Sequence, residues 1–396
     1  MKPKKSYAAR ATLNQASIWK GRRPLLLHLD IELTERCNNN CIHCYINLPA
    51  HDVAAREREL TTGEIKDLLR EAARLGCLSV RFTGGEPLLR DDFEELYLFT
   101  RRLGIKVILF TNATLINTHL AEIFSLIPPL ENIEVTLYGM KKSSYETVTR
   151  VPGSFEAAWH GISLLLEKSV PFVVRGVLLP PNKGEFKAFE EWASTIPWMD
   201  DPPDFSTILD LRCRSDSKEK NRLIRELRMS PDELVGILTR DRKDYVKEIR
   251  EFCEKFIGPD GKNLFTCGAG DGVCIDAYGH LQPCMLVRHP DAVYHLKTGS
   301  LEDALTRFFP EVRKRKAENP AYLDRCGRCF LTGLCEQCPG RSWMEHGTLD
   351  TPVEYLCEIA HQEARYLGLL TEGEKAWEVE DWKERLSLFV NNEMVK

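Results

Sequence analysis

Apolar runs alternate with amphipathic stretches along the first half of the chain. The runs predict strands at residues 25–33, 78–85, 106–112, 132–139, 171–180 and 206–212. The segments between them predict helices at 61–75, 91–103, 117–127, 154–168 and 184–196. The first helix begins with the capping-box spacing of Thr61 and Glu64. Because short links join these elements, the pattern favours parallel βαβ units in an open sheet or a barrel.

Four distinctive segments directly follow predicted strands. They are a cysteine-rich loop from residue 37, Thr-Gly-Gly-Glu-Pro at 83–87, Thr-Asn-Ala-Thr at 111–114 and Leu-Tyr-Gly at 137–139. In barrels of parallel strands, the chemistry lies on the loops after the carboxyl ends of the strands. We therefore expect the four segments to meet at one mouth.

Composition restricts the function classes. The 396 residues allow one large barrel with a smaller module, or two to three domains. A net charge of −5 argues against nucleic acid as the main partner. There is no run of 18 apolar residues, and the basic N-terminus MKPKKSYAARATLNQ has no apolar core typical of a secretion signal. We predict a cytoplasmic protein without membrane contact.

Cysteines are the strongest chemical signal in the sequence. Three of the 14, Cys77, Cys213 and Cys253, stand apart and are predicted to be buried, unreactive thiols. The other eleven form two groups. In a reducing compartment such groups indicate metal ligands rather than disulfides.

The first group consists of Cys37, Cys41 and Cys44. Thiolates select zinc, copper(I) or iron–sulfur clusters, and a structural zinc site needs four closed ligands. His43 lies between two of the cysteines and cannot readily turn to the same metal. A 4Fe–4S cluster held by three thiolates instead leaves one iron for an outside ligand.

The CxxxCxxC spacing followed by Tyr45, with Gly-Gly-Glu-Pro after the next strand, resembles the radical S-adenosylmethionine (SAM) superfamily. In that family the open iron binds the methionine part of SAM, and the reduced cluster cleaves SAM to a 5′-deoxyadenosyl radical. The resemblance implies a partial (β/α)6 TIM-type barrel over residues 25–212, with the three cysteines as catalytic cluster ligands. It implies a SAM site at Tyr45, Gly84, Gly85, Glu86 and Pro87.

Five further SAM contacts are implied by position only: Thr111, Asn112, Thr136, Arg150 and Arg175. The alternative for each is an ordinary turn residue or a solvated arginine.

The second group has eight cysteines in about ninety residues. They could bind two zinc ions or two iron–sulfur clusters, and spacing alone does not decide. Their arrangement resembles the SPASM domain, which carries two auxiliary 4Fe–4S clusters. That resemblance implies one set formed by Cys267, Cys274, Cys284 and Cys338, and another formed by Cys326, Cys329, Cys335 and Cys357.

The remaining segments complete the expected organisation. We predict an N-terminal extension at 1–24, a charged helical bridge at 213–262, the SPASM domain at 263–370 and a charged C-terminal helix at 371–396. A hairpin turn is expected at Tyr278-Gly279-His280.

The expected activity is oxidative. An auxiliary cluster can take an electron from a substrate radical, and most SPASM relatives act on peptides, so a ribosomal peptide receiving a C–S, C–C or C–O bond is the leading substrate. The alternatives are a small molecule in haem or quinone-cofactor synthesis, formylglycine formation, and a non-catalytic zinc scaffold. Met285 stands where sulfatase maturases carry a proposed catalytic aspartate, which argues against formylglycine formation. Asp276 could face the site but fits a turn better. The expected electron donor is flavodoxin or ferredoxin. Recognition would need a separate leader-binding protein, a leader-independent mode, or a different substrate.

Overall fold

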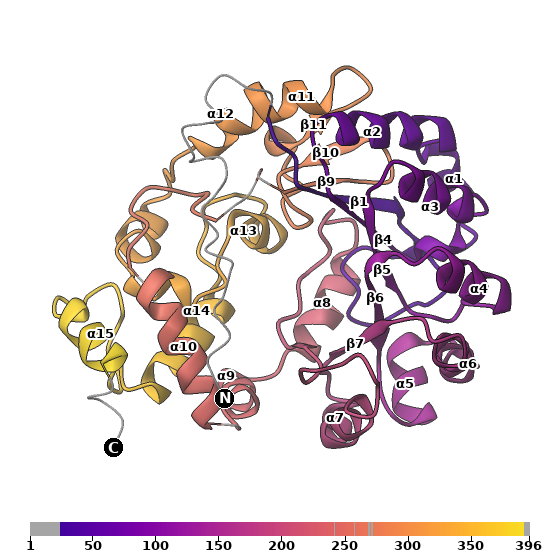
Figure 1. The fold of residues 1–396 in the computed structure, drawn as a ribbon. Helices are drawn as coiled ribbons and strands as arrows, with labels where there is room; N and C mark the ends of the chain where they lie inside the picture. The colour runs from indigo at the N-terminus through magenta and orange to yellow at the C-terminus, as the bar shows by residue number, and fades with distance from the viewer. Residues whose placement is uncertain (1–23, 241, 257, 268–269, 271, 392–396) are drawn as a thin grey trace.

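The computed structural model describes residues 24–391 except 241, 257, 268, 269 and 271. Its centre is a nine-stranded sheet in the order β11-β10-β9-β1-β4-β5-β6-β7-β8 (Figure 1). The six barrel strands pair in parallel and confirm the predicted strands: β1 His28–Thr34, β4 Ser79–Gly84, β5 Lys106–Thr111, β6 Leu130–Leu137, β7 Phe172–Val177 and β8 Phe205–Ser206. Strands β7 and β8 are shorter than predicted, since extended pairing ends at Val177 in β7 and at Ser206 in β8.

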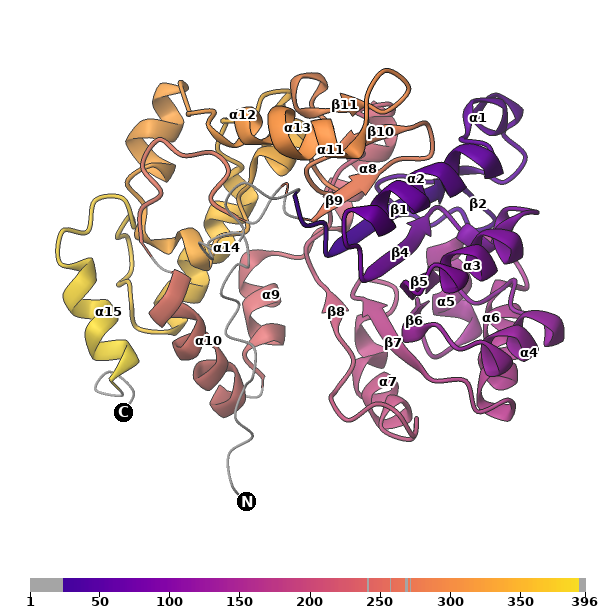
Figure 2. The ribbon, with the colours of Figure 1, turned by 45° about the horizontal axis from the view of Figure 1, so that its top comes forward.

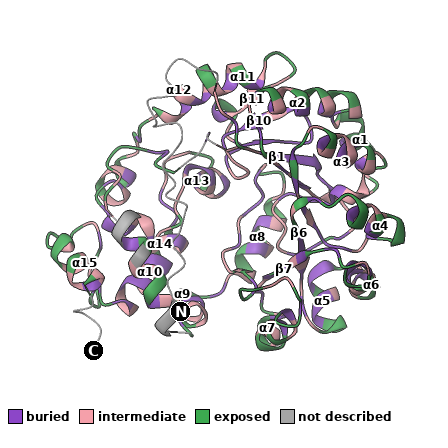
Figure 3. Cartoon of the chain, viewed as in Figure 1, coloured by how far each residue is buried: buried purple, intermediate pink, exposed green. Residues whose placement is uncertain are grey.

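Helices cover the outer face of this curved sheet (Figure 1). The five predicted helices are present as α2 Thr62–Arg74, α3 Phe93–Arg102, α4 Thr118–Leu126, α6 Ser154–Glu167 and α7 Phe186–Ala193. The Thr61–Glu64 capping box that begins α2 is also present. Two short helices were not predicted, α1 Val53–Arg58 and α5 Lys142–Thr149. Apolar side chains on the helix faces and the strands form the main core, and β1 at the centre of the sheet is buried along almost its whole length (Figure 3).

The C-terminal part joins the same sheet. The predicted hairpin consists of β9 Val273–Ile275 and β10 His280–Gln282, which pair antiparallel around Gly279. Strand β9 pairs in parallel with β1, and β10 pairs with β11 Tyr294–His295. Figure 2 shows this hairpin continuing the barrel sheet beyond β1. The pairing fixes the cysteine-rich part against the barrel edge.

The bridge is helical, as predicted, with α8 Lys218–Leu227, α9 Pro231–Leu238 and α10 Arg242–Phe256. The cysteine-rich part carries α11 Leu301–Asp303, α12 Phe309–Arg313, α13 Pro339–His346 and α14 Glu354–Tyr366. The predicted terminal helix is shorter than expected and spans α15 Trp382–Val390. Nearly all of the predicted N-terminal extension lies outside the described residues. Over the described residues, every helix is too short or too polar to cross a membrane.

Candidate active site

A cavity of about 350 Å³ opens at the carboxyl ends of the barrel strands. The first cysteine group lines it, as do residues at the carboxyl ends of β4, β5, β6 and β7. Its predicted site residues are Cys37, Cys41, Cys44, Tyr45, Gly84, Gly85, Thr111, Asn112, Thr136 and Arg175. The prediction that the loops after the strands meet at one mouth is confirmed.

The cysteine loop is held by amide groups. Strands β2 Arg36–Cys37 and β3 Leu48–Pro49 pair at its two ends. The backbone N–H groups of Asn39 and Asn47 donate to the sulfurs of Cys37 and Cys44, each at 3.4 Å. The Arg212 guanidinium donates to the Asn47 carbonyl at 3.1 Å. Donors fixed in this way stabilise thiolates that carry negative charge.

The three thiols fit a cluster better than a single ion. Burial raises the pKa of Cys41 to about 12, with the neighbouring Cys44 adding to the increase, so a bound metal must supply the charge that makes a thiolate. Within the part of the chain that the structure describes, no three His, Cys, Asp or Glu side chains could hold one metal ion. A 4Fe–4S cluster binds each thiolate through a different iron, so its ligands lie farther apart than those of zinc.

Gly84 and Gly85 let the end of β4 pack against the strand that leads into Cys37. An added Cβ at Gly84 would lie 2.1 Å from the Thr34 carbonyl oxygen, and one at Gly85 would lie 2.2 Å from that of Arg36. The Gly85 N–H donates to the Thr34 carbonyl at 2.7 Å. Backbone atoms therefore occupy the space that a side chain at either position would need. Both glycines also line the cavity.

Glu86 is fully buried and joins β4 to β5. Its carboxylate accepts from the Thr111 hydroxyl at 2.9 Å, the Asn112 N–H at 2.8 Å and the Leu88 N–H at 3.1 Å. Burial raises the pKa of Glu86 to about 7 although these donors oppose the increase. Neither Glu86 nor Pro87, which begins a short 3-10 helix, is among the residues that line the cavity, so their contacts with SAM stay predictions.

Asn112 links β5 to the cysteine loop. Its side-chain nitrogen donates to Asn38 Oδ1 at 3.0 Å and lies 3.8 Å from Cys37 Sγ. Its oxygen accepts from the Thr114 N–H at 3.0 Å. The sequence analysis did not single out Asn38, although its place directly after Cys37 is a usable signal.

The two predicted arginines differ in position. Arg175 lines the cavity, donates to Asp204 Oδ2 at 2.8 Å and pairs with Glu134. Arg150 is exposed, ends α5 with a left-handed φ of 56° and is not among the lining residues. A contact between Arg150 and SAM stays a prediction.

The cavity wall also holds Met285, together with Asp210, which the sequence analysis missed. Asp210 accepts from Arg341 Nε at 2.7 Å. Asp276 is buried in the hairpin turn. Its burial acts to raise its pKa, but ion pairs with His280 and Arg214 keep that pKa below the usual value. The interpretation of Asp276 as a turn residue is consistent with this position.

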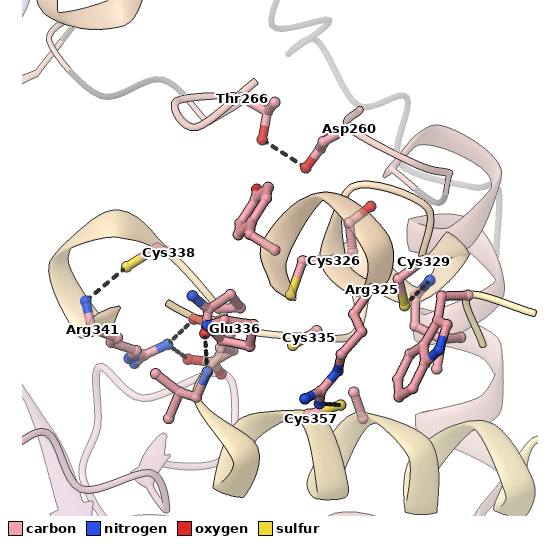
Figure 4. Close-up of a pocket in the computed structure, with 18 of the residues that line it drawn as sticks. Asp260, Thr266, Arg325, Cys326, Cys329, Cys335, Glu336, Cys338, Arg341 and Cys357 are labelled. Carbon is pink, nitrogen blue, oxygen red and sulfur yellow. Dashed lines mark hydrogen bonds and ion pairs between the residues drawn. The ribbon is translucent and has the colours of Figure 1, made fainter. Parts of the chain in front are cut away.

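A second cavity of about 290 Å³ lies in the cysteine-rich part (Figure 4). Six cysteines line it: Cys267, Cys326, Cys329, Cys335, Cys338 and Cys357. Burial raises the pKa of Cys329 to about 12, and the nearby thiols of Cys357 and Cys326 add to the increase. Burial also raises the pKa of Cys335, and the nearby thiols of Cys329, Cys357 and Cys326 add to the increase. The structure thus brings together the four thiols of the second predicted set.

The other predicted set is only partly assembled. Burial raises the pKa of Cys284 to about 11, and Cys338 and Cys267 lie close enough to contribute. Cys274 is fully buried on β9, opposite Asp30 of β1. It is not among the residues that line the second cavity. Its role as a ligand of this set stays a prediction.

Residues 31–193 match the sequence profile described as the Radical SAM superfamily. The chain therefore contains a radical SAM domain over these residues.

Relatives extend the similarity beyond the barrel. An AdoMet-dependent heme synthase of Methanosarcina barkeri (strain Fusaro / DSM 804) is 25% identical over 331 residues, covering 80% of this chain and 92% of the relative. A GTP 3',8-cyclase of Clostridium perfringens (strain SM101 / Type A) is 28% identical over 161 residues, covering 40% and 49%.

Solved structures share the fold of both parts of this radical SAM protein. Native anSMEcpe with bound AdoMet superposes with a TM-score of 0.59 at 16% identity, covering 92% of this chain and 99% of the other. Streptococcus suis SuiB bound to precursor peptide SuiA gives a TM-score of 0.58 at 17% identity, covering 84% and 76%. The protein is a radical SAM enzyme with a SPASM-type fold, and the radical SAM domain implies SAM and a 4Fe–4S cluster as cofactors.

Proposed function

We propose that this radical SAM oxidoreductase removes a hydrogen atom from its substrate at the barrel mouth and delivers a second electron to the C-terminal cysteine-rich part. The observation that carries the proposal is the pair of thiol sites: three cysteines on one cavity and a converging set of four on another. When bound at the three barrel cysteines, a reduced 4Fe–4S cluster supplies the electron that cleaves SAM to a 5′-deoxyadenosyl radical.

The residues of the chain have separate tasks in this scheme. Cys37, Cys41 and Cys44 hold the cluster, and the N–H groups of Asn39 and Asn47 stabilise two of the sulfurs. Gly85 and Asn112 hold the ends of β4 and β5 against the chain that forms the cysteine loop, through hydrogen bonds to Thr34 and Asn38.

The electron balance requires an acceptor. Removing a hydrogen atom takes one electron and one proton, and closing a new bond or double bond releases a second electron and a second proton. The four-thiol set would hold the cluster that accepts this electron. Asp210, a carboxylate on the cavity wall that is paired with Arg341, is the proposed acceptor of the proton, because Met285 cannot take one.

A peptide side chain is the substrate that the cavity favours. Arg175 is the only Arg or Lys among the described lining residues, and it is already paired with Glu134 and Asp204. Burial lowers the pKa of His43 to about 4, so this lining residue is neutral at pH 7. A substrate with several carboxylates would require unpaired cations, whereas a peptide segment does not.

The second candidate is a small molecule of haem synthesis. It is favoured by one observation, the match to an AdoMet-dependent heme synthase over 92% of that protein. For either substrate, we propose a cytoplasmic enzyme that receives electrons from flavodoxin or ferredoxin. With a peptide substrate, a separate leader-binding protein would supply recognition.

The test begins with anaerobically reconstituted protein, SAM and dithionite. We expect wild type and a Cys77→Ala control to form 5′-deoxyadenosine and Cys41→Ala to form none, since Cys77 belongs to neither cysteine group. Equal yields from wild type and Cys41→Ala would exclude the assigned site.

The substrate test adds either a short peptide encoded beside the gene or an iron porphyrin. Loss of two hydrogens from the peptide, measured by mass spectrometry, supports the first candidate. A changed porphyrin mass with an unchanged peptide supports the second.

A further inference from the structure

Cys357 is approached by two polar side chains. It lies in the first turn of α14, and its sulfur lines the second cavity. The guanidinium Nη2 of Arg325 donates to this sulfur at 3.7 Å, and Nδ1 of His361 lies 3.6 Å from it. Figure 4 shows the Arg325 side chain reaching down to Cys357. By contrast, Cys329 of the same set accepts a backbone N–H, from Leu331 at 3.4 Å.

Arg325 is fixed in this orientation. Its two terminal nitrogens donate to the two carboxylate oxygens of Glu354 at 2.6 and 2.8 Å. Its guanidinium also stacks over the Trp377 ring, 4.8 Å from the centroid. A bidentate ion pair and an aromatic face together hold the donor at the sulfur.

The hydrogen bonds of His361 define which ring nitrogen carries its proton. The Ala376 N–H donates to Nε2 at 3.1 Å, so Nε2 is the acceptor. In the neutral ring the proton is then on Nδ1, which donates to the Cys357 carbonyl at 2.8 Å and faces the sulfur. The ring packs against Trp377 with centroids 5.4 Å apart.

These residues also lie between the second cavity and a neighbouring cleft. Cys357, Arg325, His361 and Trp377 line both the second cavity and an open cleft on its other side. Cys357 is the thiol of the four-thiol set that lines this cleft, so Arg325 and His361 set the polarity around its sulfur.

We propose that Arg325 and His361 are positioning residues that raise the reduction potential of the cluster held by Cys326, Cys329, Cys335 and Cys357. The inference rests on the proposed function, because it requires a 4Fe–4S cluster at these thiols. Reduction adds one negative charge to the cluster, and donors and positive charge at a ligating sulfur stabilise that charge. A higher potential makes the one-electron transfer from the substrate radical to the oxidised cluster more favourable.

The test is a redox titration of the reconstituted full-length protein, followed by electron paramagnetic resonance without substrate. The signal of this cluster is the one that Cys357→Ser alters. Variants Arg325→Gln and His361→Phe each remove a donor, and His361→Phe keeps a ring against Trp377. Arg365→Gln is the matched control, since Arg365 lies on α14 and lines the same cleft but pairs with Gln362 and Glu372.

We expect both donor variants to make the cluster harder to reduce. At a given potential, the ratio of oxidised to reduced cluster should rise about tenfold in each variant, which is ~59 mV for a one-electron couple. The Arg365→Gln control should titrate as wild type. If iron analysis shows that Arg325→Gln has lost the cluster, Arg325→Lys and His361→Phe are compared instead.

Two results would overturn the inference: an unchanged potential in cluster-loaded donor variants, or an equal shift in Arg365→Gln. A wild-type protein that holds zinc at these thiols would instead overturn the proposed function, so the two failures are distinguishable.

Discussion

Replacing Gly85 with alanine should disable the barrel-mouth site. The new Cβ would lie 2.2 Å from the Arg36 carbonyl oxygen and 2.6 Å from both the Arg36 carbonyl carbon and the Glu35 carbonyl oxygen. All three atoms are backbone, so no side-chain rotation can relieve the clash. To reach an ordinary contact of 3.4 Å, the two segments must separate by about 1.2 Å, the difference between these two distances.

That separation has an energetic cost. It would stretch the Glu86 N–H bond to the Arg36 carbonyl from 2.9 Å to about 4 Å and weaken the Gly85 N–H bond to Thr34. One lost and one weakened hydrogen bond, at up to about 1 kcal/mol each, with overpacking of 1 kcal/mol or more, give a destabilisation of about 2 to 3 kcal/mol. A displacement near 1 Å at a reacting site lowers rates by roughly a hundredfold.

The assay measures guanidinium unfolding midpoints and dithionite-dependent 5′-deoxyadenosine formation. Gly184→Ala is the control, because an added Cβ there has no atom within 4 Å. We expect Gly85→Ala to lose stability and SAM cleavage while retaining about eight irons in the C-terminal part. Wild-type stability and cleavage in Gly85→Ala would refute the packing argument.

Three further predictions concern separate parts of the molecule. Asn112→Ala removes the hydrogen bond to Asn38, which should lower the free energy of unfolding by about 1 kcal/mol. It should also weaken SAM binding, measured by calorimetry, and an unchanged affinity for SAM would contradict the assigned link. Burial raises the pKa of Glu363 from 4.5 to about 7, so ionising it in the folded state costs about 3 kcal/mol and stability falls as pH rises between these values. Glu363→Gln should therefore be more stable than wild type at pH 8, and its stability should fall less as pH rises from 4.5 to about 7. If the stability of the variant depends on pH as that of wild type does, the assignment is wrong. Substituting Cys37, Cys41 and Cys44 together by alanine should lower bound iron from about twelve to about eight per chain, and a content of twelve would exclude them as ligands.

The sequence by itself determined which loops meet at the barrel mouth and most of the barrel. Cluster ligands on one loop must be near neighbours in sequence, so the spacing of Cys37, Cys41 and Cys44 carries the signal directly. Buried parallel strands are likewise readable as apolar runs separated by helices. The sequence did not give the ends of β7 and β8, where the paired segment stops at Val177 and Ser206.

Only the tertiary structure decided how distant segments meet. The resemblance had already implied the set of Cys326, Cys329, Cys335 and Cys357, and the structure shows that α14 brings Cys357 to the same cavity as the other three. It also places Cys274 on β9 opposite β1, away from that cavity. The contacts of Arg325 with Cys357 and of Asn112 with Asn38 join residues whose separation in sequence gives no periodic signal, whereas His361 lies one helical turn after Cys357 on α14. The physical reason is that local spacing encodes backbone conformation and single-loop ligation, while the environment of each sulfur is set by side chains that only long-range packing brings together.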